Sequence, residues 1–133
     1  MDRVFLDANV LFSAAYREGA GLQRIWSIEH IEILTSAYAP EEARRNLQDI
    51  EARSRLEALL GRIRIAPESG EEPLPSGVQI AEKDRPILRS AIAAGATHLL
   101  TGNLKDFGRF FGKRVRGVLI QTPAQYLAVG SGK

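Results

Sequence analysis

Apolar and polar residues alternate along the chain in short blocks that predict strands and helices in turn. Compact apolar runs, typical of strands buried on both faces, occur at 4–6, 31–34, 97–100 and 118–120. Apolar residues at helical spacing predict helices over 9–16, 20–29, 36–47, 47–63 and 84–95, a short amphipathic piece at 107–111 and a helix from 123 onward. This alternation favours an α/β fold, a three-layer α/β/α arrangement with a mostly parallel central sheet.

The segment 66–77 interrupts this pattern with three prolines and two glycines, which predicts a surface loop. Neither flank is long enough to fold alone, so the segment is not expected to link two domains. The chain has 133 residues, a length that suits one compact domain. We therefore expect residues 1–133 to form a single domain.

The composition excludes several kinds of chemistry. The chain has no cysteine and two histidines, His30 and His98, which removes disulfide scaffolds, thiolate nucleophiles and cysteine-based zinc sites. Any bound metal ion would need oxygen ligands. No apolar run approaches the roughly 18 residues of a membrane span, and Asp7 interrupts the first apolar stretch, unlike a secretory signal. We expect a cytoplasmic protein.

Four acidic residues lie where a sheet of this kind carries its functional site. Asp7 follows the strand 4–6, and Asp106 lies six residues past Leu100. Asp84 opens the helix that leads into 97–100, and Glu42 is in the first turns of the helix after 31–34. Ligands of open α/β sheets bind outside the carboxyl ends of the strands. The spacing therefore predicts that these acids gather at one rim.

Each of these acids also has a structural interpretation. The three aspartates are good helix N-caps, and Glu42 is favoured in a first helical turn beside Glu41. Asn9 and Thr101 can hydrogen-bond a ligand or water, or can serve as local caps. It is the spacing of the whole set that favours a functional site.

Four stretches resemble the PIN domain family of metal-dependent ribonucleases from Val4 to Leu127. They are VFLDANVLFSA, TSAYAPEEARRNL, EKDRPILRSAIAAGATHLLTGNLKDF and VLIQTPAQYL. The resemblance implies a PIN-like fold, an RNA substrate and a Mg²⁺ or Mn²⁺ cofactor. By the same resemblance, the catalytic and metal-ligating acids are Asp7, Glu42, Asp84 and Asp106.

The resemblance departs from the family pattern at one position. Many members carry Asp where this chain has Asn103, and Asp106 can then supply the fourth carboxylate. An asparagine can ligate a hard cation through oxygen but contributes no charge. The size of the chain resembles VapC-like toxin ribonucleases, which implies a small antitoxin partner and a homodimer.

Elementary chemistry supports a metal-dependent phosphodiesterase. Cations held by carboxylates screen the phosphoryl charge and activate a water molecule. The sequence has no nucleophile-elbow or triad pattern and neither a P-loop nor a GxGxxG motif. Other nucleophiles and nucleotide-binding enzymes are therefore disfavoured.

Basic residues gather toward the end of the chain. The net charge is +2 overall, but residues 101–133 carry six basic side chains and a single acid, Asp106. Together with two arginines beside Glu42, these side chains can contact the RNA backbone or simply be solvated. The candidate RNA-binding residues are Arg44, Arg45, Lys105, Arg109, Lys113, Arg114 and Arg116.

Two other functions stay open at this point. A non-catalytic RNA-binding or protein-interaction module could keep the fold, and Asn103 is its support in the sequence. A phosphoryl-transfer receiver domain would have paired acids after its first strand, which this chain lacks. The aromatic residues Trp26, Phe107, Phe110 and Phe111 are interpreted as packing residues rather than base-stacking platforms, and both histidines as structural.

Overall fold

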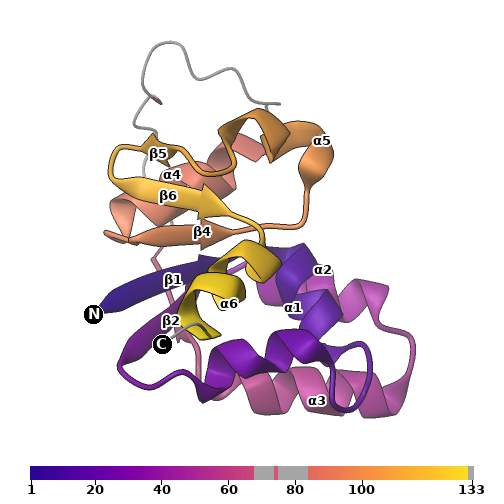
Figure 1. Cartoon of the computed structure of the whole chain (residues 1–133). Coiled ribbons are helices and arrows are strands. Elements are labelled where there is room, and N and C mark those ends of the chain that lie inside the picture. Colours follow the sequence, from indigo (N-terminus) through magenta and orange to yellow (C-terminus); the bar gives the residue numbers. More distant parts are fainter. Residues whose placement is uncertain (68–73, 75–83, 132–133) are drawn as a thin grey trace.

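The described residues form a sheet of six strands in the order β3-β2-β1-β4-β6-β5 (Figure 1). The computed structural model describes residues 1–67, 74 and 84–131. The strands are β1 (Asp2–Leu6), β2 (Ile31–Thr35), β3 (Arg64–Ile65), β4 (His98–Leu100), β5 (Arg114–Val115) and β6 (Val118–Gln121). All neighbours pair in parallel except β5 and β6. The expected mostly parallel sheet is confirmed.

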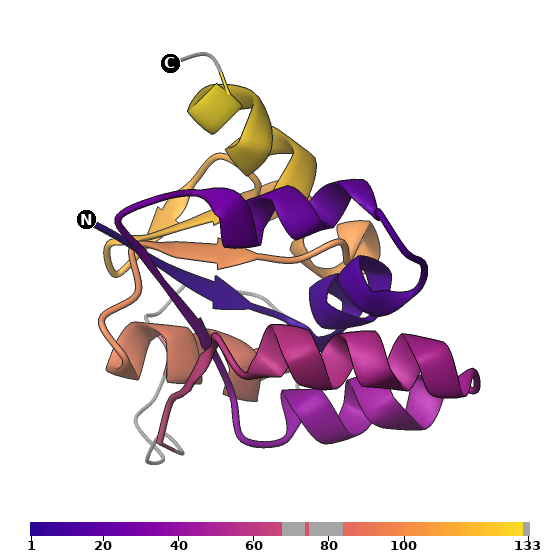
Figure 2. The same cartoon turned by 90° about the horizontal axis from the view of Figure 1, so that it is seen from below.

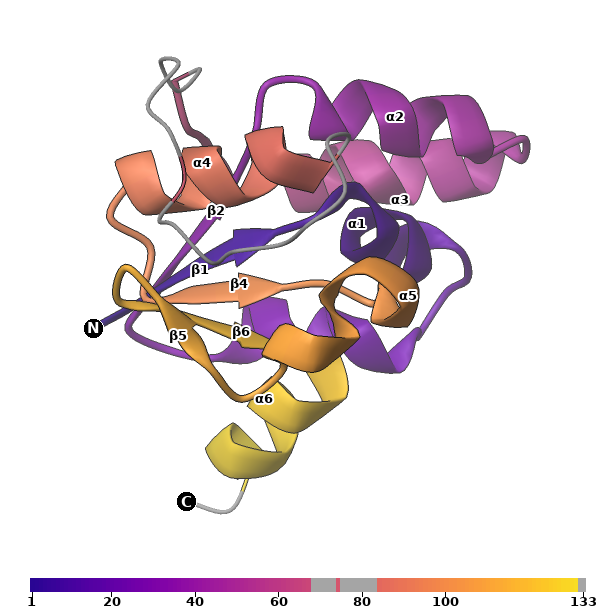
Figure 3. The same ribbon diagram turned by 90° about the horizontal axis from the view of Figure 1, so that it is seen from above.

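Helices cover both faces of this sheet. They are α1 (Ala8–Ala15), the 3₁₀ helix η1 (Gly21–Ser27), α2 (Ala39–Asn46), α3 (Ile50–Leu60), α4 (Arg85–Ala93), α5 (Leu104–Phe107), the 3₁₀ turn η3 (Gly108–Phe110) and α6 (Pro123–Ser131). In Figure 2 and Figure 3, η1 and α6 lie on one side of the strands and α4 lies on the other side. The three-layer α/β/α architecture expected from the sequence is therefore confirmed.

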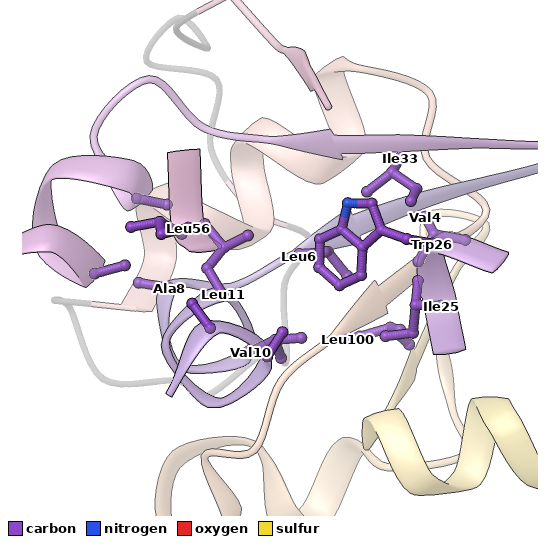
Figure 4. Packing of buried hydrophobic residues seen from close by; sticks show 14 of the residues in the cluster. Val4, Leu6, Ala8, Val10, Leu11, Ile25, Trp26, Ile33, Leu56 and Leu100 are labelled. Carbon is purple, nitrogen blue, oxygen red and sulfur yellow. The ribbon is translucent and has the colours of Figure 1, made fainter. Parts of the chain in front are cut away.

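The two faces bury separate apolar clusters because successive side chains of a strand point to opposite sides. Val4 and Leu6 pack with the side chains of α1, η1, α2, α3 and α6, whereas Phe5 packs with those of α4 and α5. Figure 4 shows the indole of Trp26 within the first cluster. Its Nε1–H donates to the carbonyl of Leu59 at 3.1 Å, which satisfies the one polar group of the ring.

The packing interpretation of the aromatic residues is confirmed for Trp26 and Phe107, which are buried in different clusters. Phe110 and Phe111 are partly buried and pack against the cluster that contains Phe107. His98 lies edge-on against the ring of Tyr126, with centroids 4.9 Å apart. These rings therefore contribute to packing of the core.

The two helices predicted between 36 and 63 are present with shorter bounds. The first ends at Asn46, with Leu47 as its C-cap, and the second begins at Ile50. Asp49 causes this restart, because its carboxylate accepts a hydrogen bond from the amide of Glu51 at 3.2 Å. The expected helix over 20–29 is a 3₁₀ helix instead.

Two short strands have no apolar run that would predict them. β5 pairs with β6 through a tight turn in which Arg116 (φ 50°) and Gly117 (φ 83°) both adopt left-handed conformations. Such a pair is typical of two-residue hairpin turns. Of the loop predicted over 66–77, residues 68–73 and 75–77 lie outside the described residues. No helix in the described part of the chain has the length and apolar character to cross a membrane.

Candidate active site

The candidate site lies where the strand order of the sheet reverses. The chain leaves β1 toward β2 on one side, whereas β4 pairs with β1 on the other side. Asp7 directly follows β1, and Thr101 directly follows β4. The amide of Asp7 donates to the carbonyl of Leu100 at 3.1 Å, so the two strand ends are joined. Open α/β sheets bind ligands at such a reversal.

Three hydrogen bonds hold the Asp7 carboxylate at this rim. Its Oδ1 accepts from the amide of Ala8 at 2.7 Å, so it also caps α1, as its structural interpretation expected. Its Oδ2 accepts from the Thr101 hydroxyl at 2.9 Å and from Nδ2 of Asn9 at 3.1 Å. Burial raises the pKa of this carboxyl, and the three hydrogen bonds oppose that rise. Asp7 is thus a partly dehydrated carboxylate held in one orientation.

Asn9 and Thr101 fix the two turns against each other. The Oδ1 of Asn9 accepts from the amide of Gly102 at 2.8 Å, and its Nδ2 lies 3.3 Å from the Thr101 hydroxyl. That hydroxyl is fully buried and also accepts from the amide of Asn103 at 3.1 Å. Both residues therefore position Asp7.

Three of the four predicted acids line one open pocket of about 370 Å³. Asp7 reaches it from β1, the exposed Glu42 from α2, and the half-buried Asp84 from the N-cap position of α4. The side chain of Asp84 makes no capping hydrogen bond to that helix. The other lining residues are Ala8, Asn9, Phe12, Tyr38, Asn46, Ile87 and Asn103.

Asp106 is placed differently from the other three acids, since it is not among the described residues that line the pocket. Asn103 lies between them: its Nδ2 donates to Oδ2 of Asp106 at 2.9 Å, and its own side chain lines the pocket. Asn103 also caps α5 by accepting from the amide of Asp106 at 3.1 Å. The interpretation of Asp106 as an N-cap is therefore wrong.

Comparison with known proteins supports the fold. No protein-family model matches the chain, and no curated protein matches it. A solved structure does match, a chain in the crystal structure of VapBC2 from Rickettsia felis bound to a DNA fragment from their promoter. The TM-score is 0.57 at 17% sequence identity, over 90% of this chain and 98% of that chain. The fold is PIN-like.

The PIN-like fold surrounds the pocket with oxygen donors. Carboxylate and amide oxygens are hard ligands of the kind that Mg²⁺ and Mn²⁺ bind, and the described residues that line the pocket include no histidine. Within residues 1–67, 74 and 84–131, no group of three or more acidic or histidine side chains is arranged to hold a metal ion. The donor set fits such an ion in kind, although the geometry is not that of a closed metal site.

Five of the described pocket-lining residues had no functional role predicted from the sequence; they are Ala8, Phe12, Tyr38, Asn46 and Ile87. Tyr38, Glu42 and Asn46 recur every four residues, so they share one face of α2, and that spacing could have revealed them. Burial and the negative charges of Asp7, Glu42 and Asp84 raise the pKa of the Tyr38 phenol. The phenol therefore remains neutral.

The predicted RNA-binding arginine Arg44 is engaged in ion pairs. Its Nε and Nη2 donate to Glu57 at 2.8 and 2.9 Å, and its Nη1 donates to Glu41 at 2.6 Å. These bonds tie α2 to α3. The other predicted basic residues are exposed and are not among the described residues that line the pocket; they are Arg45, Lys105, Arg109, Lys113, Arg114 and Arg116.

Proposed function

We propose that this protein is an endoribonuclease that depends on Mg²⁺ or Mn²⁺. One observation carries the proposal: carboxylates from three separate elements, Asp7, Glu42 and Asp84, share a pocket at the strand reversal of a PIN-like fold. When bound, the ion would supply charge screening at the phosphodiester and a more acidic water molecule.

The residues of the chain have separate tasks in this proposal. Asp7, Glu42 and Asp84 would hold the ion, and Asp106 would contribute through its contact with Asn103. The Thr101 hydroxyl and the Asn9 amide keep Asp7 oriented toward the pocket. A preorganised carboxylate need not reorient when the reaction begins.

We further propose that the protein is the toxin of a toxin-antitoxin pair, a single domain over 1–133 that acts in the cytoplasm as a homodimer with a small antitoxin. The likeness to a chain of VapBC2 supports this assignment. The test is incubation of labelled RNA with the protein and Mn²⁺, with and without a chelator. Metal-dependent internal cleavage is the expected result. RNA binding without cleavage would favour the non-catalytic module.

Mn²⁺ is expected to raise the melting temperature of the protein, and Asp7→Asn is expected to reduce this rise. A ligand that binds only the native state stabilises it by RT ln(1 + [L]/Kd), about 2.7 kcal/mol at 100 times Kd. Titration calorimetry and thermal melts measure both effects. Asp49→Asn is the matched control, because Asp49 caps α3 and does not line the pocket. Equal shifts in the wild type and Asp7→Asn would contradict the site.

Removing two charges near β5 is expected to flatten the salt dependence of RNA binding. Each phosphate contact to a single strand contributes a slope of about −0.7, so Lys113→Ala with Arg114→Ala should reduce its magnitude by about 1.4. Arg116 is left unchanged because its left-handed φ shapes the hairpin turn. Arg17→Ala with Arg24→Ala removes the same charge elsewhere and should leave the slope unaltered. An unchanged slope in the first variant would assign these residues to the solvated surface.

A further inference from the structure

Two aromatic side chains line the acidic pocket together with the carboxylates. Phe12 reaches it from α1, and Tyr38 reaches it from the residue that precedes α2. Tyr38 is 43% exposed, unlike the buried rings of Trp26 and Phe107. A tyrosine ring that borders a pocket and remains accessible can accept a flat ligand on its face.

Tyr38 also lines a second pocket, of about 190 Å³. The described lining residues of this second pocket carry no charged side chain; they are Ser36, Ala37, Tyr38, Ala66, Pro67, Pro86 and Ser90. The tyrosine therefore stands between an acidic pocket and a neutral one. A nucleotide has the same two parts, a phosphate that requires a cation and an uncharged flat base.

Neighbouring contacts hold both aromatic residues. The hydroxyl of Ser36, a residue that is only 3% exposed, accepts from the amide of Ala39 at 3.1 Å, which holds the backbone on both sides of Tyr38. The ring of Phe12 packs against the ring of Tyr16, with centroids 5.4 Å apart. Rings fixed in this way lose little further freedom when a ligand stacks on them.

We propose that Tyr38 stacks on the base of a nucleotide adjacent to the phosphodiester held at the acidic pocket, and so selects unpaired RNA; this rests on the proposed function. A base in a duplex is covered on both faces by its neighbours, whereas an unpaired base can be splayed out onto an aromatic ring. Every base has such a face, so stacking tolerates different sequences. Tyr38 acts here as a specificity-determining residue.

The test measures RNA binding apart from cleavage. The Asp84→Asn protein with Mn²⁺ is titrated with a single-stranded RNA octamer that carries one 2-aminopurine, whose fluorescence falls when the base stacks. Tyr38→Ala in the same background should weaken binding about 10-fold and abolish the quenching. Tyr38→Phe should retain both, because it keeps the ring. Ile50→Ala, which removes an exposed apolar side chain outside both pockets, should change neither.

A change on the RNA side keeps the test independent of protein folding. Replacing the 2-aminopurine by an abasic sugar should weaken binding to the parent protein by about the same factor, and should add nothing in Tyr38→Ala. The proposal would be overturned if the abasic sugar and Tyr38→Ala weakened binding additively. It would also be overturned if the protein bound the octamer and a blunt duplex with equal affinity, or if Tyr38→Ala left the affinity unchanged. Stacking without any cleavage by the wild type would instead refute the proposed nuclease and leave the role of Tyr38 in RNA binding intact.

Discussion

Asp84→Asn and Glu42→Gln are each expected to reduce RNA cleavage by about 100-fold or more while the protein stays folded. Both changes keep the shape of the side chain and remove one negative charge from the pocket that Asp7 shares. Loss of a single group that stabilises the transition state by charge commonly has effects of this size. The side chain of Asp84 makes no capping hydrogen bond to α4, so Asp84→Asn removes no helix cap.

Glu41→Gln is the matched control for this experiment. Glu41 is next to Glu42 on α2, but it pairs with Arg44 and does not line the pocket. Its loss removes an exposed ion pair, which contributes about 0.5 kcal/mol, and cleavage should stay within about twofold of the wild type. Full cleavage by a well-folded Asp84→Asn protein would remove Asp84 from the proposed ligands.

The same assay separates Asp106 from the other acids. Because Asp106 contacts Asn103 and is not one of the described pocket-lining residues, Asp106→Asn should reduce cleavage less than Asp84→Asn does. An equal loss would indicate that Asp106 binds the ion directly once the ion is present.

Thr101→Val is expected to destabilise the metal-free protein by about 1–3 kcal/mol at neutral pH. The substitution keeps the buried volume but removes the hydroxyl that donates to Asp7 and accepts from the amide of Asn103. In a domain of this size the melting temperature should fall by about 4 °C for each kcal/mol. The change also removes the hydrogen bond that most strongly lowers the pKa of Asp7.

The deficit of Thr101→Val should therefore depend on pH. The pKa of Asp7 is higher in the folded protein than its unfolded value of 3.8, so this carboxyl stabilises the native state at pH values below 3.8. This contribution to the free energy of unfolding is lost as the pH rises through the folded pKa. Thr101→Val raises the pKa of Asp7 further. The loss of stability relative to the wild type is therefore complete at neutral pH, and it becomes smaller as the pH falls through the raised pKa.

Thermal melts across this range measure the effect, and Thr35→Val serves as the control. Thr35 is equally buried, but its hydroxyl donates to the carbonyl of Leu6 at 2.7 Å, so its loss should be independent of the charge of Asp7. Parallel pH profiles for the two variants would show that the Thr101 hydroxyl does not stabilise the ionised carboxylate.

The architecture was predictable because buried parallel strands are read from local apolar runs. β1, β2, β4 and β6 match such runs within one or two residues. The same approach could not predict β3 or β5, since each has two residues and forms only by pairing with a neighbour. Edge strands of this length depend on contacts that are distant in the sequence.

Three of the four acids that were expected to gather at one rim line the same pocket. Asp7 lies directly after β1, and the sheet rule alone brings it toward Glu42 and Asp84. Asp106 is not among the described pocket-lining residues because it lies in the one-turn helix α5, which Asn103 caps. This helix has no apolar periodicity that would predict it. Tyr38 was missed because an isolated aromatic residue is usually a packing residue.

The hydrogen bond between Thr101 and Asp7 also determines when the proposed nuclease activity can arise during synthesis of the chain. These residues are 94 positions apart, and β1 cannot pair with β4 until residues 98–100 have been made. Contacts of such high sequence separation form late, because closing a long loop costs entropy before the contact compensates for it. A growing chain that carries β1, α1 and β2 therefore has its first carboxylate but no assembled pocket. A ribosome that translates this protein would not be exposed to the proposed nuclease activity until most of the chain had been made.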